Sequence, residues 1–275
     1  MISAVDYDFF RRLLQQRSGL VLSDDKQYLI ESRLMPLVRR LNLSGIAEIA
    51  QKLRQPGSQA LEESVVEAMT TNESFFFRDK LPFDTFVQVM LPAIASARPA
   101  GQPLRIWCAA ASTGQEPYSL AMALKENPRA AAGRRVDIIA TDLSNEVLER
   151  ARAGIYSQFE VQRGLPIQLL VKYFAKQSET WQISPEIRAM VEYRKLNLLH
   201  PFAGLGKFDI VFCRNVLIYF GAETKGDVLT RIARVLAPDG YLVLGAAETV
   251  VGVSEAFRPV PARRGLYAVH LPALA

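Results

Sequence analysis

The sequence predicts an α/β protein in two parts: a small all-helical domain, followed by a larger domain built on a mostly parallel sheet. Over the first eighty residues apolar side chains recur at helical spacing, and no strand pattern competes with them. From about residue 100, continuous apolar runs alternate with helical segments, which is typical of parallel strands covered by helices on both faces. A chain of 275 residues that is 49% hydrophobic is long enough to bury a core in each part.

The helical part begins with apolar side chains at helical spacing between residues 7 and 14, and Ser18-Gly19 is expected to end that helix. Ser23 is a suitable N-cap for a second helix that continues to residue 41. Pro36 should kink or split this second helix, because proline has no N–H to donate. Shorter helices are expected near residues 44–54 and 59–69.

The sheet part is predicted from four apolar runs, which cover residues 105–111, 136–142, 208–213 and 241–245. Helices are expected at residues 118–124, from the N-cap Ser144 to residue 151, and near residues 222–236. The tail, residues 257–270, is predicted to add an antiparallel strand pair. Residues 160–196 fit the alternation poorly, and we expect a small inserted β-subdomain at about 165–193. The expected division is therefore a helical domain at 1–69, a linker at 70–82 and a Rossmann-like domain at 83–275.

Composition argues against several classes of protein. No apolar run approaches the roughly 20 residues that cross a bilayer, and no signal peptide is visible, so a cytoplasmic protein is expected. Cys108 and Cys213 lie in apolar runs and are predicted to be reduced core thiols. With only His200 and His270 besides, we expect no metal site. The net charge of +5 lies beyond residue 80, which weakly favours an acidic partner.

The loop after the first strand is where a ligand is expected, because open parallel sheets bind ligands at the carboxyl ends of their strands. There Ser112-Thr113-Gly114 precedes Glu116, and Asp142 ends the second strand. The loop lacks the GxGxxG pattern of a pyrophosphate site, whereas an acid in the position of Asp142 commonly bonds ribose hydroxyls. Together the two acids favour a positively charged nucleoside such as S-adenosylmethionine. A tight turn followed by acids at two helix starts is the structural alternative, and these residues leave it open.

Two further segments carry polar side chains where a purely structural sequence would not. Arg214, Asn215 and Tyr219 follow the strand at 208–213, and the Asn/Asp-Pro-Pro-aromatic motif usual in nucleic-acid amino-methyltransferases is absent there. This absence counts against a nucleic-acid substrate. Residues 70–79 place three phenylalanines between polar side chains, as expected of a linker that its aromatic rings anchor over a cleft.

Four stretches together resemble the motifs of the chemotaxis receptor glutamate methyltransferases, the CheR family. They are TTNESFFFRD at 70–79, AAASTGQEPYS at 109–119, ATDLS at 140–144 and FCRNVLIYF at 212–220. They stand in the family's order, and the similarity covers nearly the whole chain. The resemblance implies a helical domain, a linker and a Rossmann-like methyltransferase domain with a small β-subdomain. It also implies transfer of a methyl group from S-adenosylmethionine to receptor glutamates.

The resemblance further implies roles for individual residues. Arg78 and Tyr219 would lie nearest the substrate carboxylate as the catalytic pair. Glu116 would hold the methionine portion of the cofactor and Asp142 its ribose. The other implied cofactor contacts are Asn72, Ser74, Arg78, Asn197, Leu198, Asn215 and Val216.

The implied partner is the cytoplasmic helical bundle of methyl-accepting chemotaxis receptors, contacted through Arg33, Arg39 and Arg40. A solvated charged face is the plainer interpretation of these arginines. We expect a monomer, recruited to membrane receptor arrays, that neither binds nucleic acid nor inserts into the membrane. Some family members bind a receptor's C-terminal peptide through a glycine-bearing loop. Because residues 173–183 are short and lack glycine, we expect recognition without such a tether. The rival functions are methylation of another substrate class and cofactor sensing without catalysis.

Overall fold

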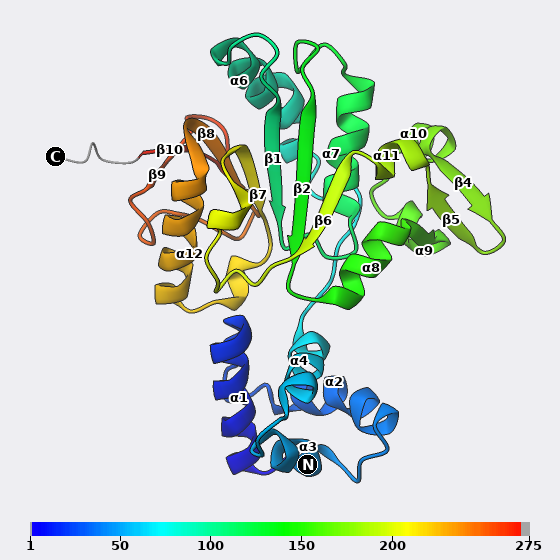
Figure 1. Cartoon of the computed structure of the whole chain (residues 1–275), viewed down its shortest axis with the longest axis vertical. Coiled ribbons are helices and arrows are strands. Elements are labelled where there is room, and N and C mark those ends of the chain that lie inside the picture. The colour runs from blue at the N-terminus through cyan, green and yellow to red at the C-terminus, as the bar shows by residue number, and fades with distance from the viewer. Residues whose placement is uncertain (1, 271–275) are drawn as a thin grey trace. The chain divides into compact units, whose positions relative to one another are not determined.

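The computed structural model describes residues 2–270, which divide into two compact units (Figure 1). The first unit contains the residues up to Thr71 together with Tyr219–Thr224. The second contains Asn72–Ile218 and the residues from Lys225 onward. None of the helices within residues 2–270 is long and apolar enough to cross a membrane.

The first unit is built from four helices: α1 (Ala4–Ser18), α2 (Gln27–Arg40), α3 (Ile46–Leu53) and α4 (Gln59–Met69). Gly19 ends α1 in the left-handed conformation at φ 78°, as the sequence predicted. The predicted N-cap Ser23 is wrong, because its hydroxyl bonds the Asp25 carboxylate and α2 begins four residues later. Of the predicted kink or split at Pro36, the split is wrong, because α2 continues through Pro36 to Arg40. Pro36 and Ser32, whose carbonyl loses its helical donor, are both exposed, so water can take that bond.

The second unit contains a seven-stranded sheet in the order β6-β2-β1-β7-β8-β10-β9. Its strands are β1 (Leu104–Ala109), β2 (Val136–Asp142), β6 (Val191–Lys195), β7 (Phe208–Cys213), β8 (Leu236–Leu244), β9 (Phe257–Pro259) and β10 (Leu266–Val269). The first five strands of this order run parallel, whereas β10 is antiparallel to both β8 and β9. This arrangement confirms the predicted fold class and the antiparallel strands at its end.

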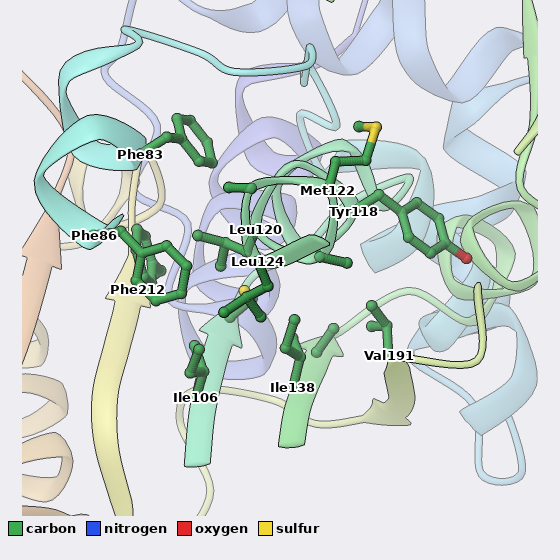
Figure 2. Close-up of a cluster of buried hydrophobic side chains, with 14 of the residues drawn as sticks. Phe83, Phe86, Ile106, Tyr118, Leu120, Met122, Leu124, Ile138, Val191 and Phe212 are labelled. Atoms are coloured by element: carbon green, nitrogen blue, oxygen red, sulfur yellow. The ribbon is translucent and has the colours of Figure 1, made fainter. Parts of the chain in front are cut away.

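Helices cover this sheet, and the hydrophobic core lies between the helices and the strands. The helices are α5 (Leu81–Thr85), the π-helical η1 (Phe86–Met90), α6 (Leu91–Ala97), α7 (Gln115–Glu126), α8 (Asn145–Ala153) and α12 (Ala222–Val235). Figure 2 shows side chains of α7, among them Leu120 and Leu124, facing Ile106 and Ile138 of the sheet. On the other face of β1, Trp107 packs against Phe202, with 4.9 Å between the ring centroids. Ser144 caps α8 as predicted, because its hydroxyl accepts the Val147 N–H at 3.4 Å.

A second, three-stranded sheet has the order β3-β5-β4, with β3 (Ile155–Ser157), β4 (Phe174–Gln177) and β5 (Thr180–Ile183). Three short helices accompany it: α9 (Gln158–Gln162), α10 (Ile167–Tyr173) and α11 (Pro185–Arg188). This small sheet lies on the β6 side of the main sheet, away from β9 and β10 (Figure 1).

One expectation about the insertion needs correction. The segment that begins near residue 190 was assigned to the inserted subdomain, but β6 pairs in parallel with β2, with Val191 opposite Ile138. Because β6 is an edge strand, its residues alternate between buried and exposed positions. The same alternation is typical of the strands of a small antiparallel sheet, so the pattern of residues 191–195 does not distinguish the two.

Candidate active site

The loop after β1 turns sharply at the carboxyl edge of the sheet. Ala110, Ser112 and Gly114 have positive φ values of 61°, 50° and 93°, and two of these residues are not glycine. Such a cluster of left-handed residues is costly and usually marks a functional site. At Gly114 an added Cβ would lie 2.7 Å from the Tyr193 hydroxyl, so only glycine allows this turn to pack against β6.

Asp142 joins two loops at this edge. One of its carboxylate oxygens accepts the Ser112 N–H at 2.8 Å, and the other accepts the Ser144 N–H at 3.1 Å. The Ser112 hydroxyl in turn donates to the Asn72 carbonyl at 2.8 Å. A carboxylate offers about four acceptor positions, so these backbone bonds are compatible with hydroxyl groups of a ligand as well. The predicted residues Asn72 and Asp142 are thus brought together through Ser112.

The centre of the site is a buried guanidinium, that of Arg214, whose side chain is only 2% exposed. It donates to the Glu116 carboxylate at 2.9 Å, to the Asp79 carboxylate at 2.7 Å and to the Arg78 carbonyl at 2.9 Å. Arg214 therefore links the end of β7 to the first turn of α7 and to the segment before α5. The place of Arg214 after a strand is expected from the sequence, whereas its role in the site is not.

Burial raises the pKa of the Glu116 carboxyl above its usual value of 4.5. The charge and hydrogen bond of Arg214 act in the opposite direction but do not cancel this effect, and the neighbouring Glu248 carboxylate raises the pKa further. Because the charged form of Glu116 is under-compensated, a positively charged ligand beside it would be stabilised. An ammonium or sulfonium group meets this requirement, so the site fits a cationic nucleoside better than a phosphate.

Glu248 is a second residue that the sequence analysis missed. Its carboxylate is buried and accepts N–H groups from Asn215, Val216 and Gly245, at 2.7, 3.0 and 2.7 Å. The predicted cofactor contacts Asn215 and Val216 are therefore fixed by their backbones. A single acid in the loop sequence Gly-Ala-Ala-Glu carries no signal of such a role.

The phenylalanine segment, residues 70–79, is anchored by its aromatic rings, as predicted. Phe76 is fully buried and contacts the rings of Tyr156 and Phe174, at centroid distances of 5.0 and 5.6 Å. The Phe77 N–H donates to the Ser119 hydroxyl at 2.9 Å, which ties the segment to α7. Arg78 follows, half-buried, with its guanidinium 5.3 Å from the centre of the Phe75 ring.

The other predicted residues are distributed as follows. Asn197 and Leu198 follow β6 at the same edge, where the neighbouring Leu196 N–H donates to the Asp142 carbonyl at 2.9 Å. Ser74 is half-buried in the phenylalanine segment. Tyr219 groups with the first unit, where its carbonyl accepts the Val21 N–H at 3.0 Å. Its pairing with Arg78 therefore stays a prediction.

Comparison with known proteins divides the chain into the same two parts, a helical domain and a ligand-binding domain. Residues 5–70 match the all-alpha domain of CheR methyltransferases, and residues 72–266 match their SAM binding domain. The chain is 46% identical to chemotaxis protein methyltransferase 1 of Pseudomonas aeruginosa, over 95% of this chain and 96% of that protein. Chemotaxis protein methyltransferases of Pseudomonas putida and Vibrio parahaemolyticus are 42% and 40% identical to it, over 95% and 96% of this chain and 96% of each relative.

The raised pKa of Glu116 predicts the pH dependence of ligand binding. A carboxyl whose folded-state pKa lies above 4.5 loses its charge at a higher pH than an ordinary glutamate does. Binding of S-adenosylhomocysteine, which keeps the ammonium group, should therefore weaken as the pH falls through that raised pKa. Titration calorimetry of Glu116→Gln should show a Kd for S-adenosylhomocysteine that is raised about tenfold or more at neutral pH. In this variant the Kd should not rise further as the pH falls. Glu146→Gln, at an exposed acid in the first turn of α8, is the control, and a wild-type pH profile in Glu116→Gln would contradict the assignment.

Proposed function

The chain belongs to the CheR family of S-adenosylmethionine-dependent chemotaxis protein methyltransferases, and we propose that it esterifies glutamate side chains of chemotaxis receptors. The observation that carries the proposal is a pair of acids in a site without a phosphate-binding loop: Glu116 in the first turn of α7 and Asp142 at the end of β2. This donor set fits a cationic nucleoside. S-adenosylmethionine, when bound, supplies a sulfonium methyl group that a carboxylate can accept in a single displacement.

A carboxylate substrate makes few chemical demands on the protein. With a pKa near 4.3, a glutamate side chain is already ionised at neutral pH and needs no general base. The residues of the site have to hold the carboxylate oxygen in line with the methyl group, at about 3–3.5 Å, and to exclude water. The small number of histidines, two in the whole chain, is therefore compatible with this reaction.

Arg78 is the group that we assign to the substrate carboxylate. The Arg78 carbonyl accepts a bond from Arg214, which also donates to Glu116, and this link to the cofactor acid supports the assignment. The orientation of the Arg78 guanidinium is supported by the Phe75 ring and by a 3.3 Å bond to the Glu73 carbonyl. A guanidinium can form two parallel bonds to a carboxylate, which would fix the direction of attack. Tyr219 would complete the orientation of the substrate.

Receptor docking is proposed for the last turn of α2, where Arg39 and Arg40 are exposed. Arg33 has a different environment. Its guanidinium donates to the Met69 carbonyl at 2.5 Å and to the Thr71 hydroxyl at 2.8 Å, so it caps the end of α4. Reversing the charge at Arg33 would therefore disturb α4 as well as any docking. Arg39 and Arg40 are the cleaner positions for a test.

We also propose that recognition needs no peptide tether. The β4–β5 hairpin turns through only Ser178 and Glu179, with Ser178 at φ 51°. A two-residue turn leaves no loop there in which a receptor's C-terminal peptide could be held. Receptors with and without such a C-terminal peptide should be methylated equally.

The proposed reaction predicts the chemistry of the product. Purified protein, methyl-labelled S-adenosylmethionine and receptor-bearing membranes should give a labelled receptor band, and mild base should release the label as methanol. Base-stable label would mean that an amine was methylated, which would exclude the glutamate assignment. Binding of the cofactor without any transfer, across several receptors, would favour the alternative of a sensing module.

Arg78→Ala should lower kcat by about 100-fold or more, because it removes a charged donor that acts on the reacting carboxylate. Binding of S-adenosylhomocysteine should change much less. Arg163→Ala is a matched control, since the Arg163 guanidinium also packs on the Phe75 ring, at 4.4 Å from its centre, and bonds Glu73. Near-normal turnover in Arg78→Ala would remove the proposed role.

Arg39→Glu combined with Arg40→Glu should raise the KM for receptor membranes by about fivefold or more, with kcat unchanged. The effect should shrink at high salt, because exposed charges are screened. Arg12→Glu reverses an exposed charge on α1 and serves as the control. An unchanged KM at low salt would place the docking surface elsewhere.

A further inference from the structure

Glu248 has an unusual set of partners for a loop residue. One oxygen of its carboxylate accepts the N–H groups of Asn215 and Gly245, both at 2.7 Å. The other oxygen accepts those of Val216 and Ile218, at 3.0 and 3.3 Å. Glu248 is only 9% exposed. Four backbone donors therefore converge on one buried carboxylate, as in the anion-binding nests that turns with a left-handed residue form.

The position of this carboxylate explains what it holds. β7 and β8 are parallel neighbours, with Cys213 opposite Leu244, so the chain leaves both strands at the same edge of the sheet. The loop after β8 returns through a turn in which the Glu248 N–H bonds the Gly245 carbonyl at 3.0 Å. The side chain of Glu248 thereby joins the two strand exits, which no strand pairing connects beyond Leu244.

Two features show that this join is closely fitted. Asn215 adopts the left-handed conformation at φ 58°. This conformation costs free energy for any residue that has a side chain, so it persists only where the surroundings enforce it. At Gly245, an added Cβ would lie 2.7 Å from the side-chain nitrogen Nδ2 of Asn215 and 2.8 Å from the carboxylate oxygen Oε2 of Glu248. The turn at Gly245, the carboxylate and the strained residue thus fit one another with no space left.

We propose that Glu248 is a positioning residue for methyl transfer: by holding the backbone of residues 215–218, it sets where Arg214 and Asn215 stand in the cofactor site. This inference rests on the proposed function for its place in catalysis. Arg214 immediately precedes the held segment and bonds Glu116, so a shift of this backbone is transmitted to the acid that we assign to the cofactor. The effect of the Glu248 charge on the pKa of Glu116 supports the same proximity.

The test compares Glu248→Gln with the wild-type protein and with Glu255→Gln, an exposed glutamate in the same loop. The glutamine has the same shape, but its NH₂ group cannot accept and would face two of the four donors. We expect the Kd for S-adenosylhomocysteine and the KM for S-adenosylmethionine to rise about tenfold, with the KM for receptor membranes unchanged. Hydrogen exchange of residues 215–218 should accelerate, while β7 stays protected.

A purely structural role would lower the free energy of unfolding without changing Kd or KM for the folded protein, and that result would overturn the proposal. If Glu248→Gln does not fold, Gly245→Ala provides the second test, because its Cβ displaces the same turn without altering any charge. It should also weaken cofactor-product binding, and an unchanged Kd in a folded Gly245→Ala would equally overturn the proposal. Binding of S-adenosylhomocysteine does not need a methyl-accepting substrate. A raised Kd in Glu248→Gln would therefore support the positioning role even if no receptor were methylated.

Discussion

The arrangement of the site depends on the buried charge of Arg214. A guanidinium at 2% exposure requires partners, and it finds them in Glu116, Asp79 and the Arg78 carbonyl. Buried ion pairs add little net stability, because desolvation offsets their attraction, whereas removing one partner is costly. The gain is therefore geometric. The end of β7, the start of α7 and the segment before α5 can adopt only the relative positions in which these bonds form.

The segment before α5 shows what this constraint holds in place. Phe77, Asp79 and Lys80 have positive φ values of 49°, 67° and 43°, and three such side-chain-bearing residues within one short segment are unusual. On one side the fully buried Phe76 fixes the segment, and on the other Arg214 holds Asp79. Arg78 lies between these two anchors, so its backbone is held in place. This is the pre-organisation that catalysis by positioning requires.

Sequence patterns predicted those parts of the fold whose signals are local. The buried strands β1, β2 and β7 are continuous apolar runs, and Gly19 and Ser144 are caps with familiar chemistry. The edge strand β6 was misassigned because its alternation matches that of an antiparallel strand. Glu116 and Asp142 could be predicted because one comes soon after a recognisable strand and the other ends one. Glu248 could not, because three of its four partners lie about thirty residues earlier in the chain and all four are backbone groups, which leave no trace in residue identity.

The charges of the site also bear on how a reaction cycle would end. Before transfer, the acid at Glu116 suits a cation, and the guanidinium of Arg78 suits an anion. Transfer of the methyl group neutralises both reactants, since the sulfonium becomes a thioether and the carboxylate becomes an ester. The bond that we propose between Arg78 and the substrate carboxylate would then become a bond to a neutral oxygen, without the attraction between opposite charges. If Arg214 and Glu248 hold the site in the arrangement that suits charged reactants, as we propose, the loss of both charges would favour release of the methylated side chain.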